Sequence, residues 1–280
     1  MKIRVASGIA GAILLFFVVW SGQIVLGLFI FLLSILALNE FYNAVSNIGY
    51  KPVKFIGYMA SVYMFLVCSK GPLNKYGINI EFIYSFRSAL LGVFLALLIL
   101  FCYIIFLHNK FNISDISATV FGILYIVFLF GFVILIRNMV NGFYYVWLIF
   151  IGAFATDTFA YFSGYLFGKH KLMPEISPKK TVEGSIGGIV GCALVMGFYG
   201  MYLNFNNPAN VIPLYHFIIL GIICGVISQI GDWSASAIKR YVKIKDYGNI
   251  MPGHGGVLDR FDSILFTAPV VYFYLSIVLF

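Results

Sequence analysis

Four aspartates in the C-terminal half of the chain have the residue type and setting for ligand chemistry. Asp157 lies deep in an apolar run, and Asp232 directly follows the segment 227–231. Asp259 and Asp262 open the last apolar segment, where a spacing of three places both carboxylates on one face of a helix. Ionisable residues in membrane segments are costly and usually functional. Carboxylates that converge without a cysteine or histidine cluster suit a hard cation such as Mg²⁺.

A structural interpretation of these aspartates is the alternative. They could be helix-end acids, or they could form buried ion pairs with Lys239, Arg240 or Arg260. This interpretation is weaker for Asp157 and Asp232, because the nearest cationic residues are Lys169 and Lys239, twelve and seven positions further along.

A basic loop follows the apolar run that contains Asp157. Paired lysines at the N-terminus of a helix can bind phosphate, because the first backbone N–H groups of a helix have no internal partner. The alternatives are a helix cap made by Ser or Thr and nonspecific attraction to anionic lipid. No GKS or GKT sequence is present, so the loop is not a Walker A motif. The candidate residues are Ser177, Lys179, Lys180, Thr181 and Glu183.

A second basic loop precedes the last apolar segment. Its Pro252–Gly253 and Gly255–Gly256 pairs favour turns and let backbone N–H groups approach an anion. His254 lies between glycines, where it is badly placed for core packing, so we expect it to be functional. The remaining histidines lack such a context, and we interpret them as structural.

The composition predicts that membrane-spanning helices position these residues. The chain is 62% hydrophobic and 10% charged, whereas soluble domains average about 45–50% apolar and about 25% charged residues. This excludes an ordinary soluble domain and a nucleic-acid-binding domain, despite a net charge of +8. We predict an all-α polytopic membrane protein with about nine spans, or eight if the first two form one helix, and no strand alternation. The predicted spans are 5–20, 24–42, 53–69, 87–108, 116–136, 143–165, 185–204, 212–238 and 260–280.

The lysines and arginines predict the orientation of these spans. With the N-terminus in the cytoplasm, fourteen of the 18 Lys and Arg residues lie on the cytoplasmic side, as the positive-inside rule requires. Both basic loops then face the cytoplasm, where nucleotides are available. We expect scaffold helices in 1–140 and the site in 141–280. Glycines four apart, at 164/168, 184/188 and 187/191, predict close helix packing.

The second basic loop resembles the signature of the phosphatidate cytidylyltransferase (CDP-diacylglycerol synthase) family. That signature reads S-x-apolar-K-R-x4-K-D-x-small-x2-apolar-P-x-H-G-G-apolar-x-D-R-apolar-D. Met251 departs mildly, because leucine, isoleucine or phenylalanine is usual there. The Ser177–Gly184 run, the Asp157 segment and Gly231–Asp232 also resemble the family, in the expected order. The matching residues are Ser236, Ile238, Lys239, Arg240, Lys245, Asp246, Gly248, Pro252, His254, Gly255, Gly256, Val257, Asp259, Arg260, Phe261 and Asp262.

The resemblance implies an enzyme that converts CTP and phosphatidic acid into CDP-diacylglycerol and pyrophosphate. It implies Mg²⁺, with a second cation left open, held by Asp232 and Asp259 with Asp262 as a third ligand. Asp157 would support this site, hold a metal through water or contact the ribose. The resemblance also implies a homodimer. A short chain with no transit peptide suits a bacterial cytoplasmic membrane. The implied phosphate contacts are Lys179, Lys180, Lys239, Arg240, Lys245 and Arg260, with His254, Gly255 and Gly256; Ser177, Thr181, Glu183 and Asp246 would shape the substrate site.

Two other functions stay open at this point. A cytidylyltransferase could act on another lipid phosphate, of the archaeol or polyprenyl type, because the sequence does not separate headgroup contacts. A cation transporter could use the buried aspartates, although it has no evident need for clustered basic loops.

Overall fold

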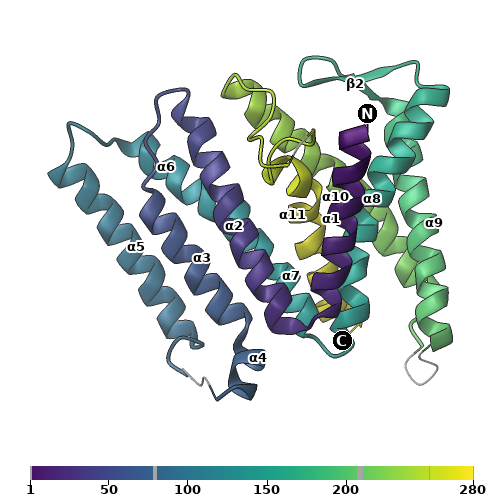
Figure 1. Ribbon diagram of the computed structural model, residues 1–280, viewed down its shortest axis with the longest axis horizontal. Helices are drawn as coiled ribbons and strands as arrows, with labels where there is room; N and C mark the ends of the chain where they lie inside the picture. The colour runs from purple at the N-terminus through teal and green to yellow at the C-terminus, as the bar shows by residue number, and fades with distance from the viewer. Residues whose placement is uncertain (1, 78–80, 207–210, 252, 280) are drawn as a thin grey trace. The chain divides into compact units, whose positions relative to one another are not determined.

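The computed structural model of the chain describes residues 2–77, 81–206, 211–251 and 253–279, with side chains from residue 7 onward (Figure 1). Within these residues it has seven helical segments that are long and apolar enough to cross a membrane. Two shorter apolar helices, Ser7–Trp20 and Lys54–Cys68, fall in two further predicted spans. The prediction of an all-α multi-pass membrane protein is therefore confirmed. The seven segments are Gln23–Ser46, Phe86–Phe106, Ile113–Asn138, Gly142–Phe167, Val182–Asn206, Leu214–Tyr241 and Leu258–Leu279.

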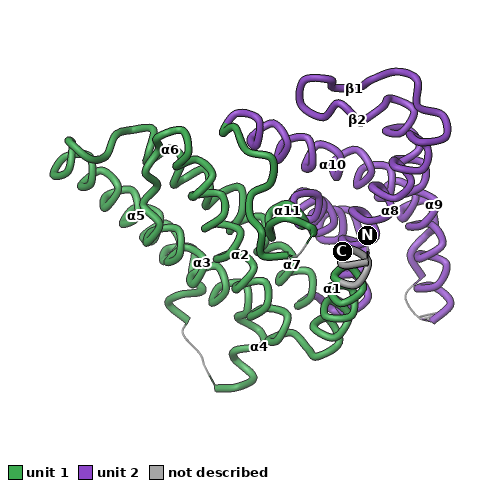
Figure 2. Tube along the Cα trace, turned by 45° about the horizontal axis from the view of Figure 1, so that its top comes forward, with its two compact units in different colours: residues 1–138, 242–260 green, residues 139–241, 261–280 purple. Residues whose placement is uncertain are grey.

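The chain divides into two compact units (Figure 2). Unit 1 comprises residues 1–138 and 242–260, and unit 2 comprises residues 139–241 and 261–280. The first boundary is close to the predicted division at 140. The second basic loop, however, groups with the N-terminal helices of unit 1, whereas we had assigned it to the C-terminal region.

Unit 1 is built around α2. Gly22, at a φ of 118°, separates α1 from α2, so the first two spans are distinct helices. Side chains of α2 pack on α3, α7 and η1, and the hydroxyl of Tyr42 donates a 2.9 Å hydrogen bond to the carbonyl of Thr119. The elements are α1 (Lys2–Trp20), α2 (Gln23–Ser46), α3 (Lys54–Cys68), α4 (Lys70–Lys75), α5 (Phe86–Phe106), α6 (Ile113–Gly122), the π-helical η1 (Ile123–Phe128) and α7 (Leu129–Asn138).

Unit 2 packs α8, α9 and α10 closely against one another. A Cβ added at Gly184 would lie 2.8 Å from the carbonyl oxygen of Ala160, and one at Gly188 would lie 2.9 Å from that of Thr156. The backbone of α9 therefore approaches α8 where glycines are present, which confirms the predicted packing role. The elements are α8 (Gly142–Phe167), β1 (Lys171–Met173), β2 (Ser177–Thr181), α9 (Val182–Asn206), α10 (Leu214–Tyr241), α11 (Leu258–Phe273) and the π-helical η2 (Tyr274–Leu279).

A short antiparallel hairpin formed by β1 and β2 replaces the irregular loop that the sequence predicted after α8. Lys171 pairs with Thr181 and Met173 with Ser177. The sequence showed no strand alternation in this segment. The strands have three and five residues, too few to show an alternating pattern in a mostly polar segment. The hairpin matters because β2 contains Lys179 and Lys180 and is followed directly by α9, so both lysines lie just before the first turn of this helix.

Candidate active site

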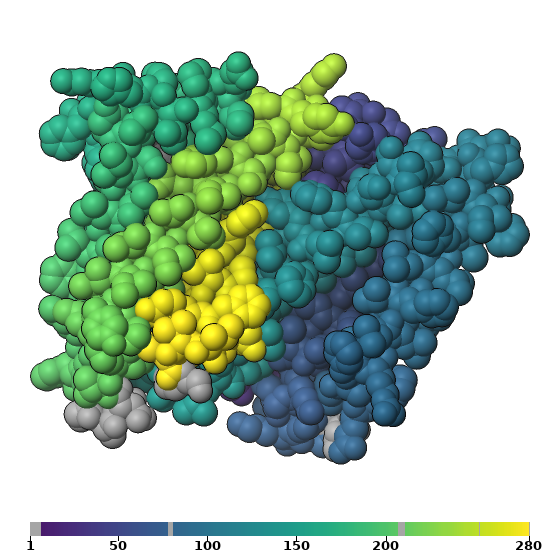
Figure 3. Space-filling view, turned by 180° about the vertical axis from the view of Figure 1, so that it is seen from behind, coloured from purple at the N-terminus to yellow at the C-terminus, as the bar shows by residue number. Residues whose placement is uncertain are grey.

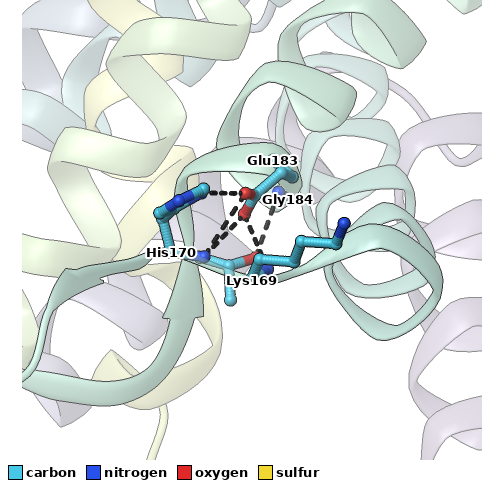
Figure 4. A network of polar contacts seen from close by, with 5 residues as sticks. Lys169, His170, Glu183 and Gly184 are labelled. Atoms are coloured by element: carbon cyan, nitrogen blue, oxygen red, sulfur yellow. Dashed lines mark hydrogen bonds and ion pairs between the residues drawn. The ribbon is translucent and has the colours of Figure 1, made fainter.

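The hairpin is fixed to the start of α9 by Glu183 (Figure 4). Its carboxylate accepts the backbone N–H groups of Lys169 at 3.1 Å and of His170 at 3.2 Å. The ring Nδ1 of His170 lies 2.6 Å from Glu183 Oε1. At the same turn, Thr181 Oγ1 accepts the N–H of Gly184 at 3.1 Å. Glu183 and Thr181 therefore shape this loop, and His170, which we had interpreted as structural, is part of the same network.

Lys180 brings the acidic residues of unit 2 together. Its ammonium group forms an ion pair with the carboxylate of Asp232 on α10. It is also attracted by Asp157 on α8 and Asp262 on α11, and repelled by Lys239. Residues predicted from four separate sequence segments are therefore gathered in one region of unit 2. We call Asp157, Lys180, Asp232, Lys239 and Asp262 the carboxylate–lysine cluster.

Burial changes the acidity of the lysine in this cluster. Removal of Lys180 from water lowers its pKa from 10.5 to about 8, although Asp157 and Asp262 act in the opposite direction. Burial destabilises the charged form of a lysine, and nearby carboxylates stabilise it. Lys180 is consequently an ammonium ion near neutral pH, and in its half-buried position the charge lies close to the carboxylates.

Close packing of α10 and α11 positions two members of the cluster. A Cβ added at Gly231 would lie 2.7 Å from the carbonyl oxygen of Asp262 and 3.2 Å from the Cα of Ser263. Ser263 Oγ also donates to the carbonyl of Ser228 at 3.2 Å. Figure 3 shows the side chains of α10 and α11 side by side on one face of unit 2. The absence of a side chain at residue 231 thus lets the helix that carries Asp232 approach the one that carries Asp262.

Trp233 is a site residue that the sequence analysis missed. The ammonium of Lys180 lies 5.7 Å from the centroid of its ring, a cation–π distance. Its indole Nε1 is buried and has no hydrogen-bond partner among the residues that the structure describes. Its position next to Asp232 was the available signal, but a tryptophan in an apolar helix is ordinarily a packing residue.

The second basic loop is folded by hydrogen bonds within unit 1. His254 Nδ1 lies 2.8 Å from the hydroxyl of Ser7 on α1. Arg260 Nε donates to the carbonyl of His254 at 2.7 Å, and Met251 donates its N–H to the carbonyl of Gly255 at 2.9 Å. His254 and Arg260 therefore hold the shape of the loop. Pro252 of the signature lies outside the described residues.

Two carboxylates bind the backbone of this loop in unit 1. Asp259 Oδ2 accepts the N–H groups of Tyr247 at 2.7 Å and Gly256 at 2.9 Å. Glu40, on α2, accepts those of Val257 and Leu258, each at 2.9 Å. We call this arrangement of two carboxylates and four N–H groups the Glu40 clamp. The sequence analysis missed Glu40, although an acidic residue inside the predicted span 24–42 was the signal used for Asp157.

The predicted metal ligands do not form one compact group. Among the described residues, no three His, Cys, Asp or Glu side chains lie close enough together to hold a metal ion. Asp232 and Asp262 belong to the cluster in unit 2, whereas Asp259 binds the backbone of its own loop in unit 1. Metal binding by these carboxylates stays a prediction.

The other predicted residues lie on the surface or in the loops. Lys179, Lys245 and Asp246 are exposed, and Ser177 and Gly255 are half-buried. Arg240 is exposed and its Nε donates to the carbonyl of Ile176 in the hairpin turn at 3.3 Å. The exposed lysines are available to solvent, and Arg240 ties the end of α10 to the hairpin.

Comparison with known proteins identifies the family. The sequence model of the cytidylyltransferase family matches residues 2–278. The chain belongs to this family. The match includes the N-terminal helices and Glu40, which the signature alone did not cover, and it confirms the resemblance drawn from that signature.

Relatives within the family align along nearly their whole length. The phosphatidate cytidylyltransferase of Bacillus subtilis (strain 168) is 34% identical over 284 residues, which cover 99% of this chain and 98% of the relative. The phosphatidate cytidylyltransferase of Staphylococcus saprophyticus is 33% identical over 275 residues, 97% of both chains. The protein of that name from Staphylococcus aureus (strain COL) is 32% identical over 280 residues, again 97% of both. The similarity therefore extends along the whole chain, including the N-terminal helices.

Proposed function

We propose that this cytidylyltransferase-family protein transfers the cytidylyl group of CTP to phosphatidic acid, forming CDP-diacylglycerol and pyrophosphate. The support comes from relatives named for this activity over 97–99% of the chain. It comes equally from a basic and acidic site in unit 2 suited to phosphate chemistry. The observation that carries the proposal is the gathering of Lys180, Asp232 and Asp262 from three separate elements of a membrane protein.

The chemistry requires charge neutralisation more than a strong base. A phosphate oxygen of phosphatidic acid attacks the α-phosphorus of CTP, and the bond from that phosphorus to the β-phosphate breaks to release pyrophosphate. A phosphomonoester has a second pKa near 6, so the attacking group is already mostly ionised at pH 7. Two anionic substrates must approach each other, and cationic side chains such as Lys180 and Lys239 offset their repulsion.

The carboxylates of the cluster fit Mg²⁺ by the chemistry of their donor atoms. Mg²⁺ is usually held by one or two carboxylates together with water and substrate phosphates, so it does not need all three of Asp157, Asp232 and Asp262. They outnumber the ammonium groups of Lys180 and Lys239, so the cluster has an excess of negative charge. We propose Asp232 and Asp262 as ligands, with Asp157 in support; Mg²⁺ would neutralise phosphate charge when bound. Metal titration of the wild type and of Asp259→Asn tests whether Asp259 is a further ligand and whether a second cation binds.

Location and assembly follow from the same proposal. The bacterial relatives support a bacterial cytoplasmic membrane. The distribution of lysine and arginine supports an orientation with the N-terminus and both basic loops on the cytoplasmic side. CTP would then enter from the cytoplasm, while phosphatidic acid keeps its acyl chains in the bilayer. We propose a homodimer on the basis of the family alone.

The test is pyrophosphate release by the purified protein in detergent. Release is expected with CTP, phosphatidic acid and Mg²⁺ together, and it should be lost when lipid or metal is omitted. Archaeol-type and polyprenyl phosphates, supplied at the same CTP concentration, test the lipid specificity. If folded protein released no pyrophosphate with any of these lipids and several divalent metals, the proposal would be wrong, and ion flux in liposomes would be measured next.

A further inference from the structure

Glu40 is a buried acidic residue for which the proposed reaction supplies no role. It lies on α2, inside a membrane-spanning helix, and its side chain is 4% exposed. A carboxylate in such a place is very costly unless hydrogen bonds compensate for the lost water. Its position 217 residues before Val257 in the sequence makes this a long-range contact that local structure does not explain.

The bonds of Glu40 go to the first N–H groups of α11. Oε1 accepts from Val257 and Oε2 from Leu258, the first residue of the helix, both at 2.9 Å. These N–H groups have no partner inside the helix. A negative charge at this end is also favoured by the helix dipole. Glu40 thus caps the start of α11, whose residues 258–260 belong to unit 1 together with α2.

The loop backbone is shaped to fit around this carboxylate. A Cβ added at Gly248 would lie 2.6 Å from Glu40 Oε1, and one at Gly256 would lie 2.5 Å from Oε2. A side chain at either position would force the carboxylate and the loop apart and disturb their hydrogen bonds. Gly248 and Gly256 therefore lie directly against the Glu40 carboxylate, with no room for a side chain between them and its oxygens.

The two residues bound by Glu40, Val257 and Leu258, directly precede the signature residues Asp259 and Arg260 in the sequence. Asp259 and Arg260 lie in the first turn of α11, next to Leu258. The Asp259 carboxylate accepts hydrogen bonds from the loop N–H groups of Tyr247 and Gly256. The Arg260 side chain donates one to the loop carbonyl of His254. We propose that Glu40 is a positioning residue that sets the orientation of Asp259 and Arg260 for cytidylyl transfer, an inference that rests on the proposed function.

Glu40→Gln tests this role, because the amide keeps the shape but offers one acceptor in place of two. We expect hydrogen exchange at Val257 and Leu258 to accelerate about tenfold or more. We expect kcat of the folded protein to fall about 10²-fold, since small misplacements of reacting groups have effects of this size. The KM for CTP should change less than about threefold if the lost interaction acts in the transition state.

Asp115→Asn is the matched control. Asp115 is also buried in unit 1, at 1% exposure, and accepts two backbone N–H groups, from Lys51 at 2.6 Å and Asn112 at 2.8 Å. These bonds hold the start of α6, which carries no predicted site residue. This variant should lose stability and accelerate exchange at its own two amides, yet keep a wild-type kcat per folded molecule.

Three results would overturn the inference. They are an unchanged kcat in Glu40→Gln, unchanged exchange at Val257 and Leu258, or an equal loss of kcat in the Asp115→Asn control. If Glu40→Gln does not fold, Gly248→Ala keeps the glutamate but places a methyl group against its carboxylate, and the same kcat and exchange effects are expected. Failure of the proposed function is recognised separately, because the wild-type protein and the control would then also be inactive while the exchange results still test the contact.

Discussion

The two units of this protein use carboxylates in opposite ways. In unit 1, Glu40 and Asp259 are bound by four backbone N–H groups of one loop. In unit 2, Asp157, Asp232 and Asp262 face the side-chain ammonium groups of Lys180 and Lys239. A backbone N–H cannot leave its carboxylate unless the loop refolds, whereas a lysine side chain can rotate towards an incoming phosphate. The comparison assigns positioning to unit 1 and ligand binding to unit 2.

The assignment of ligand binding to unit 2 would be wrong if the carboxylates of this unit were dispensable for activity. Asp232→Asn should lower kcat about 10²–10³-fold, the size of effect seen when one preorganised electrostatic contact is removed. The reason is that the amide neither pairs with Lys180 nor binds a divalent cation well. Pyrophosphate release by folded protein is the measurement. Glu175→Gln, an exposed carboxylate in the hairpin of the same unit, should remain near wild type.

Substitutions of Lys180 test the role of the ammonium group in the cluster of unit 2. Lys180→Met should reduce kcat/KM about 10²-fold, because removal of one partner of a largely buried ion pair leaves the other uncompensated. Lys180→Arg keeps the charge and should recover part of the activity. A Lys180→Met enzyme as active as the wild type would show that the ammonium serves packing alone.

The packing that brings α10 to α11 is tested by Gly231→Ala. The added methyl group would overlap the backbone at Asp262 and Ser263, and we expect a loss of about 1–3 kcal/mol of stability, as for other overpacked sites. Gly197→Ala on α9 is the control, since its Cβ would lie 3.5 Å from Ile218, an ordinary contact. Thermal unfolding of both variants in detergent measures the difference. Equal melting temperatures would contradict the proposed close approach.

The last expected effect is a pH dependence of stability. Because burial lowers the pKa of Lys180 from 10.5 to about 8, the unfolded chain holds more protons than the folded protein between these values. The free energy of unfolding should therefore rise with pH in this window, by at most about 1.4 kcal/mol per pH unit. Unfolding of the wild type and of Lys180→Met is measured at pH 8 and pH 10 without metal. The free energy of unfolding of the wild type minus that of Lys180→Met should be higher at pH 10 than at pH 8. A constant difference would mean that Lys180 titrates as in water.

Much of the site was predictable from the sequence because its residues occur in an ordered signature. The segments of Asp157, Lys180, Asp232 and Asp262 were each recognised locally, and the structure places them together in unit 2. Glu40 and Trp233 were missed for a physical reason. Glu40 acts on residues 217 positions away, and Trp233 differs from a core tryptophan only through the lysine beside it.

Composition and periodicity determined the membrane helices, because burial in a bilayer requires long apolar segments whatever their neighbours are. The signature likewise indicated the family from one contiguous stretch of the sequence, without knowledge of the tertiary structure. The tertiary structure alone decided that the second basic loop folds with the N-terminal helices, that a hairpin carries Lys180 to Asp232, and that Glu40 caps α11. Each of these depends on hydrogen bonds and ion pairs between distant segments, and such bonds exist only after the helices have packed.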